Sequence, residues 1–243
     1  MRRKLTILLG ALLVTGAVNA YAAAPSSAAQ LLWHCGPSIG EKTGYKDSRC
    51  REGGPPFNYK WFRYNENAGS VIVSAGATFA LKLTVGIIPV TVTCTSQSAK
   101  GTMENPTGGG SAILNAGASM TLSGCTTNQK ECVVKNVGGT AGTIKTASLK
   151  GLAGESGSPA VVGLRFEPST GEVFVEIELS ACSTTGLNGK YQITGSAFGV
   201  ANNTSSSLEF TATSSSLKLG GGGVTLVGTT VEESEAGEAL KIE

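Results

Sequence analysis

Two side chains that are common in catalytic and metal sites are almost absent from this sequence. It has one histidine, His34, and one aspartate, Asp47. A serine-protease triad requires a histidine base and a buried acid that orients it, and a calcium loop requires several acidic residues at short spacing. His34-Cys35 and the segment around Ser156 are similar to two serine-protease motifs, but His34 lies near the start of the chain and no aspartate follows Asp47. These absences argue against a triad protease and a calcium site.

Long apolar runs are also missing, except at the N-terminus. Arg2, Arg3 and Lys4 precede an apolar run over residues 5–18, and Ala20-Tyr21-Ala22 follows it. This order indicates a secretory signal peptide over residues 1–22. The run is shorter than the about 20 residues that span a bilayer. We therefore expect a secreted, extracellular protein with no membrane span after cleavage, whether or not it stays on the cell wall.

No excess of positive charge accompanies this export signal. The chain has 19 basic and 17 acidic residues, and three of the basic ones lie within residues 1–22. The mature protein thus has 16 basic residues against 17 acidic ones, a formal net charge of −1. Nucleic-acid binding normally requires a clear basic excess, so we do not expect nucleic acid as a partner.

Six cysteines occur, but none forms a Cys-x-x-Cys pair. With one histidine, this leaves zinc without a ligand set, and we predict no metal site and no cofactor. An even number of cysteines in an exported chain is typical of three disulfides, although the sequence does not choose among the connectivities. Joining near neighbours first gives the hypothesis Cys35–Cys50, Cys125–Cys132 and Cys94–Cys182.

Helical patterns are missing, and alternation of apolar and polar residues with a period of two takes their place. It is clearest over 172–179, where Val173, Val175, Ile177 and Leu179 share one face and Glu172, Phe174, Glu176 and Glu178 the other. Strands are also predicted at 71–74, 79–85, 90–94, 120–122, 142–149, 161–166, 191–194, 208–212 and 223–227. Many short strands separated by turns predict an all-β fold. We expect an antiparallel β-sandwich over residues 68–231, with a closed β-barrel as the alternative.

Aromatic residues make up only 6% of the chain, and half of them lie between residues 31 and 67. We expect residues 23–67 to form a small, disulfide-closed aromatic module. A strand over 57–64 would place Tyr59, Trp61 and Arg63 on one face and Lys60, Phe62 and Tyr64 on the other. Exposed Trp and Tyr stack on sugar rings or anchor protein interfaces, so the candidate ligand-binding residues are Tyr59, Trp61, Arg63 and Trp33. The alternative is that this segment caps the open end of the main core.

Glutamates are the remaining candidates for catalytic residues. Alternate residues of a strand lie about 6.5–7 Å apart, so a pair among Glu172, Glu176 and Glu178 has the spacing of glycosidase carboxylates. Such charges are equally common on solvated strand faces. A second group lies near the C-terminus, and we expect residues 232–243 to form a solvated acidic tail. Its members are Glu232, Glu233, Glu235 and Glu238.

Short motifs follow one another in a distinctive order along the chain. The first are Trp33-x-Cys35, Tyr45-x-Asp47-x-x-Cys50 and Tyr59-x-Trp61, and those that follow are Cys94, Cys125, Cys132, Gly142–Thr146, Leu149–Leu152, Cys182 and Gly189–Tyr191. In this order they resemble an uncharacterised group of exported actinobacterial proteins. The resemblance implies secretion and a cysteine-stapled β fold. It implies no functional residues, because no activity is known for the group.

These observations together favour a non-catalytic secreted or cell-surface protein of structural or binding type. Its expected partner is a cell-wall polysaccharide or an extracellular protein, bound through the aromatic module. The alternative is a secreted, glycosidase-like hydrolase that uses a glutamate pair.

Overall fold

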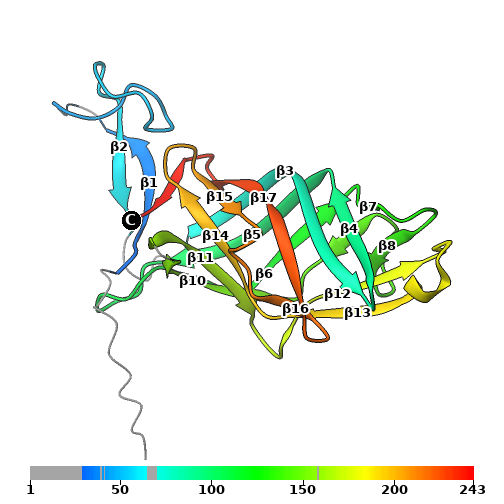
Figure 1. The fold of residues 1–243 in the computed structure, drawn as a ribbon. Coiled ribbons are helices and arrows are strands. Elements are labelled where there is room, and N and C mark those ends of the chain that lie inside the picture. The colour runs from blue at the N-terminus through cyan, green and yellow to red at the C-terminus, as the bar shows by residue number, and fades with distance from the viewer. Residues whose placement is uncertain (1–28, 39, 41, 65–69, 158) are drawn as a thin grey trace, which may run out of the picture.

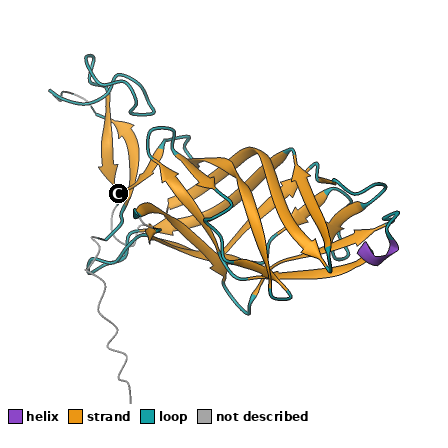
Figure 2. Cartoon of the chain, viewed as in Figure 1, coloured by secondary structure: helices purple, strands orange, loops and turns teal. Residues whose placement is uncertain are grey.

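The computed structural model describes residues 29–38, 40, 42–64, 70–157 and 159–243 (Figure 1). The expected signal peptide and residues 23–28, 39, 41 and 65–67 of the expected N-terminal module lie outside the described residues. Within the described ranges, every regular element is a strand apart from one 3-10 turn, η1 (Thr185–Leu187) (Figure 2). The all-β class is therefore confirmed. No helix long and apolar enough to cross a membrane occurs among the described residues.

Eight antiparallel strands form a closed barrel. The strands are, in order around the ring, β3 (Ser70–Val85), β5 (Ser96–Glu104), β6 (Ile113–Ser123), β10 (Leu149–Ser156), β11 (Val161–Pro168), β14 (Ala197–Asn202), β15 (Ser207–Phe210) and β17 (Gly222–Ser234). Each pairs with the next, and β17 pairs back with β3. The architecture is thus the closed barrel that we considered as the alternative, rather than a two-sheet sandwich, because β3 and β17 bond to each other and close the ring.

β3 and β17 extend beyond the barrel and carry a second group of strands, which we call the distal lobe. β3 pairs with β5 over residues 70–76 and with β4 over residues 79–85. β17 likewise passes from β15 to β16, from which the sheet continues through β13 and β12 to β8. The lobe comprises β4 (Ile88–Cys94), β7 (Thr126–Thr127), β8 (Val133–Asn136), β9 (Thr143–Lys145), β12 (Val173–Ser180), β13 (Gly189–Thr194) and β16 (Leu217–Leu219).

Phe79 fills the junction between the barrel and the distal lobe. It is fully buried, and its ring centroid lies 5.9 Å from that of Phe210. A Cβ added at Gly228 would lie 2.6 Å from the Phe79 ring, and the β3–β17 register shifts just after Gly228. Glycine therefore allows close approach at the point where the ladder is irregular, as is common at β-bulges.

A three-stranded sheet, which we call the cap sheet, lies at the other end of the barrel. It joins β1 (Leu32–Pro37) to β2 (Tyr59–Arg63) on one side and to β18 (Leu240–Ile242) on the other. The expected acidic tail over residues 232–243 is therefore wrong, because this segment contains the end of β17 and all of β18. Three of its four predicted tail glutamates are paired: Glu233 with Arg49, Glu235 with Lys100 at 2.6 Å, and Glu238 with His34 at 3.1 Å.

Three disulfides connect neighbouring segments. Cys35 is joined to Cys50, as expected, but the other two expected pairs are wrong. Cys94 is joined to Cys125, because β4 pairs with β7 and brings their flanking residues together. Cys132 is joined to Cys182, because β8 pairs with β12. Strand pairing, rather than closeness along the chain, thus determines the connectivity.

One expected strand face is also different. The period-two pattern placed Phe174 beside the glutamates on the solvated face of β12, yet Phe174 and Val175 are both buried. The β12–β13 register shifts between Val173 and Val175, and this irregularity turns Phe174 inward.

We predict that tryptic peptide mapping without reduction will show these links. Cleavage after Lys130 separates Cys125 from Cys132, so the connectivities give different peptide pairs. The structure requires peptide 83–100 to be joined to 101–130, and 131–135 to 166–190. A link between 101–130 and 131–135 would contradict it.

Candidate functional site

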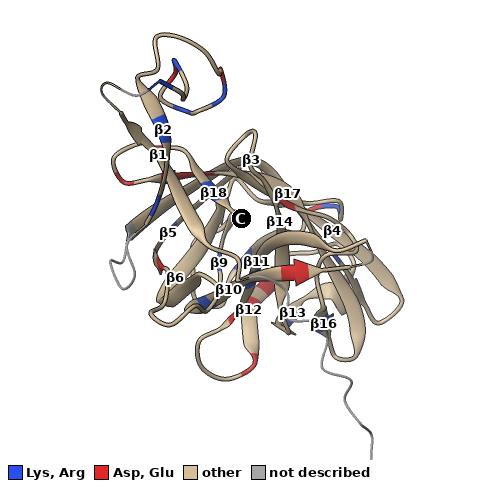
Figure 3. Cartoon of the chain, turned by 90° about the vertical axis from the view of Figure 1, so that its left-hand side faces the viewer, with Lys and Arg blue, Asp and Glu red and all other residues tan. Residues whose placement is uncertain are grey.

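The cap sheet has two chemically different faces. Its inner face carries Leu32, Leu240 and Ile242, which are buried and belong to the same apolar core as the barrel residues. Leu32 is directly paired with Ile242, so both side chains point to the same side of the sheet. Figure 3 looks at this end of the barrel, where β1 and β18 lie across the opening. Aliphatic residues therefore cover the open end of the core.

His34 also lies on the inner side, opposite Leu240. Its ring is 4.5 Å from that of Tyr64, and its Nδ1 lies 3.1 Å from Glu238 Oε2. Asp47, in the loop between β1 and β2, accepts hydrogen bonds from the backbone N–H groups of Arg51 and Glu52 at 2.9 Å each. His34 and Asp47 thus serve local structure, and Ser156 ends β10 in the barrel wall.

The outer face of the cap sheet brings together all four residues that the sequence predicted for ligand binding. Trp33 is directly paired with Arg63, and Trp61 and Tyr59 continue the same face along β2. Trp33, Tyr59 and Trp61 are half-buried, and Arg63 is exposed. We define the outer face by these four residues and Lys241, which pairs with Trp33 from β18.

Lys241 holds the two indole rings of the outer face. Its Nζ lies 5.2 Å from the Trp33 ring centroid and 5.1 Å from that of Trp61, within the range of a cation–π contact. The same ammonium lies 2.6 Å from Glu243 Oε2, and only 13% of the Lys241 side chain is exposed. On the same face, Tyr59 and Trp61 pack against Cys35 and Cys50, and Trp61 is directly paired with Cys35. The rings are therefore fixed in place before any ligand arrives.

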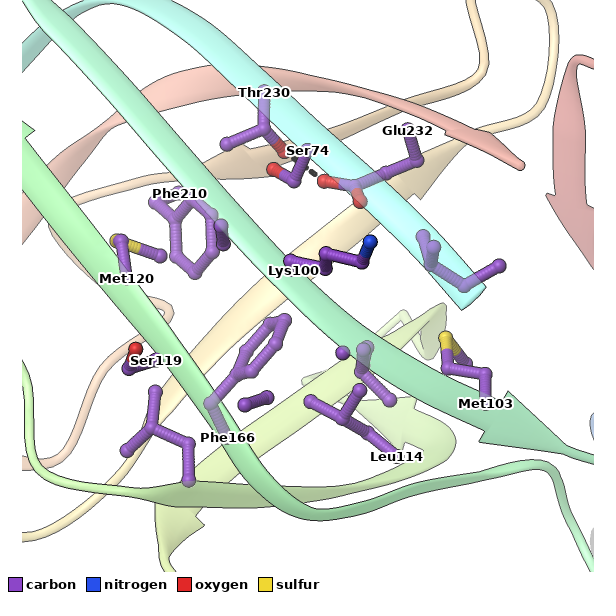
Figure 4. Close-up of a pocket in the computed structure, with 16 residues that line it drawn as sticks. Ser74, Lys100, Met103, Leu114, Ser119, Met120, Phe166, Phe210, Thr230 and Glu232 are labelled. Carbon is purple, nitrogen blue, oxygen red and sulfur yellow. Dashed lines mark hydrogen bonds between the residues drawn. The ribbon is translucent and has the colours of Figure 1, made fainter. Parts of the chain in front are cut away.

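A second candidate site lies inside the barrel, around the carboxyl of Glu232 near the end of β17 (Figure 4). Thr230 donates a hydrogen bond to this carboxyl, and Ser74, directly opposite on β3, also faces it. The residue as a whole is half-buried, but its carboxyl is enclosed by protein. Burial raises the pKa of Glu232 to about 7, although hydrogen bonds from Thr230 and Ser74 act in the opposite direction. Sequence reasoning missed this site, because it assigned Glu232 to an acidic tail.

The three glutamates considered for hydrolysis do not meet in one pocket. Glu178 is ion-paired with Lys135 at 3.5 Å, and Glu176 accepts a hydrogen bond from Gln192 at 3.2 Å. Glu172 precedes β12 and lines an open groove with Glu167 and two lysines. In the part of the chain that the structure describes, no three His, Cys, Asp or Glu side chains are grouped as a metal site.

We predict that the Glu232→Gln variant loses less stability than the wild type as the pH rises toward neutral. A carboxyl whose pKa is raised in the folded state does not change the free energy of unfolding below about pH 4.5, because the carboxyl is then protonated in both the folded and the unfolded state. As the pH rises toward 7 the unfolded state ionises first, which lowers the free energy of unfolding by about 3 kcal/mol, and this penalty remains above pH 7.

Urea denaturation between pH 4.5 and 8.5 measures this difference, with Glu209→Gln on the exposed side of β15 as the control. The wild type and the control should lose stability relative to Glu232→Gln as the pH rises. Parallel pH profiles for all three proteins would show that Glu232 ionises normally.

We compared the chain with known protein families, curated proteins and solved structures. No protein-family model, no curated protein and no solved structure matches the chain.

Proposed function

We propose that this chain is an exported, non-catalytic binding protein that recognises a cell-wall polysaccharide through the outer face of its cap sheet. The observation that carries the proposal is the arrangement of Trp33, Tyr59 and Trp61 on one sheet face, with their indoles held by Lys241. Aromatic rings present broad apolar area at a low entropic cost, which suits stacking on sugar rings.

The two faces of the cap sheet have different packing partners, and this difference supports the proposal. The inner face already seals the barrel with Leu32, Leu240 and Ile242. Covering the main core therefore does not account for the rings of the outer face, which pack instead on a disulfide and a lysine. A rigid, half-exposed aromatic surface of this kind binds without a large ordering cost.

The charges around the outer face favour an anionic polysaccharide. Arg63 is exposed beside Trp33, and a guanidinium recognises carboxylates and phosphates through paired hydrogen bonds. The loop between β1 and β2 carries both basic and acidic residues (Figure 3), and Lys46 and Arg49 in it are ion-paired with Glu52 and Glu233, so Arg63 is the cation on which this preference rests. Ligand affinity should therefore fall as the salt concentration rises.

Export is the second part of the proposal. Three disulfides are typical of proteins that fold in oxidising compartments, and the N-terminal pattern is that of a secretory signal peptide. Under this proposal the working protein begins at Ala23 and meets its ligand outside the cell.

We predict that Trp61→Ala abolishes most polysaccharide binding. Truncating a central Trp anchor typically costs about 2 kcal/mol or more, which is about 30-fold in affinity. The measurement is co-sedimentation of the mature protein with purified cell wall and a set of insoluble polysaccharides. Ile87→Ala is the matched control, because Ile87 is 94% exposed at the β3–β4 turn, far along the sheet from the cap.

Circular dichroism and thermal unfolding must first show that each variant is folded. Loss of binding in Trp61→Ala and Trp33→Ala, with wild-type binding in Ile87→Ala, is the expected result. Wild-type binding in both Trp variants would place any site elsewhere. No binding to wall or polysaccharide would contradict the proposed ligand class and leave a protein partner as the better candidate.

A further inference from the structure

The interior of the barrel contains two adjacent spaces of about 40 and 30 Å³. Each exceeds the about 10–15 Å³ that one water molecule requires. They share the same four lining residues: Ile72, Met103, Leu164 and Glu232. Glu232 therefore lies between the two spaces, and its carboxyl is the ionisable group that they have in common.

The larger space is mainly apolar. Figure 4 shows Phe166, Phe210, Met120 and Leu114 around it, and Glu232 with Ser74 and Thr230 at one side. The smaller space reaches the cap sheet, where Leu32, Leu240 and Ile242 close it. The arrangement is a mainly apolar chamber beneath a sheet that covers the end of the barrel, with one carboxyl that lies beside the hydroxyls of Ser74 and Thr230. The other uncharged polar side chains that line it are Ser119 in the larger space and Asn203, Ser206 and Ser207 in the smaller one.

The carboxyl of Glu232 has no cationic partner among the described residues. Two lysines line the spaces, but each ammonium is bound to another glutamate: Lys100 Nζ lies 2.6 Å from Glu235, and Lys241 Nζ lies 2.6 Å from Glu243. A carboxylate enclosed in protein is costly unless a positive charge or hydrogen-bond donors accompany it. Two hydroxyls supply only part of this compensation.

We propose that the barrel interior binds a small primary alkylamine, with its ammonium group on Glu232 and its alkyl chain among Phe166, Phe210 and Met120. An ammonium supplies three donors and the charge that the carboxyl lacks. A carboxylate ligand would meet repulsion at Glu232, and an alcohol would supply no charge. The size of the two spaces restricts the ligand to a few heavy atoms, and n-butylamine is the probe of choice.

Methionine methyl groups give a direct test, because Met103 and Met120 are the methionines that follow residue 22 and both line the larger space. In protein labelled with ¹³C at the methionine methyl groups, n-butylamine should shift both resonances in a saturable manner. Binding should strengthen from pH 5.5 to 8, because Glu232 must be ionised to pair with an ammonium. 1-Butanol and butyrate, which match the chain length, should bind at least about 10-fold more weakly.

Glu232→Gln should weaken n-butylamine binding about 10-fold or more and remove its pH dependence, whereas Glu209→Gln should leave both unchanged. Equal affinities for butylamine and butanol would reduce the site to a plain apolar cavity and overturn the proposal. Absence of any shift at 50-fold excess over protein would also overturn it, and this second readout does not depend on whether Glu232→Gln folds. Neither result bears on polysaccharide binding at the outer face.

Discussion

The antiparallel ladder between β3 and β17 is the constraint on which the rest of the structure depends. It runs from Lys82 paired with Thr225 to Ile72 paired with Ser234, and so passes through both the barrel and the distal lobe. In the barrel it closes the ring of eight strands, and in the distal lobe it supports β4 on one side and β16 on the other. Phe79 packs closely over Gly228, its partner on β17, at the point where the ladder passes from the barrel into the distal lobe.

Closure of the barrel in turn fixes the cap sheet and both candidate sites. After β17 ends, the chain returns as β18 and pairs with β1, so residues more than 200 positions apart become neighbours. This pairing places Ile242 beside Leu32 on the inner face and Lys241 beside Trp33 on the outer face. It also leaves Glu232 enclosed under the cap, between apolar residues of the barrel wall. The outer face and the buried carboxyl are thus two results of one strand arrangement.

Local patterns were informative where structure depends on neighbours along the chain. Period-two alternation correctly placed Tyr59, Trp61 and Arg63 on one face, because alternation within one strand sets that relation. It predicted parts of β3, β4, β6, β11, β12, β13, β15 and β17, but it missed β1, β5, β8, β14, β16 and β18. Long-range pairing has no such signal. The disulfides of Cys94 and Cys182, the cation–π contacts of Lys241 and the burial of Glu232 all depend on which strands meet. Phe174 was misplaced because a register shift interrupts the alternation on which the prediction relied.

Hydrogen–deuterium exchange of the protein tests most directly whether the β3–β17 ladder unites the two halves. The slowest amides should lie on β3 and β17 in both the barrel and the distal lobe, and they should exchange with one common free energy of opening. The cap sheet, which joins the barrel through one face only, should open at a lower free energy. Separate opening free energies for the barrel and distal-lobe segments of β3 would contradict a shared ladder and indicate two independently folding units.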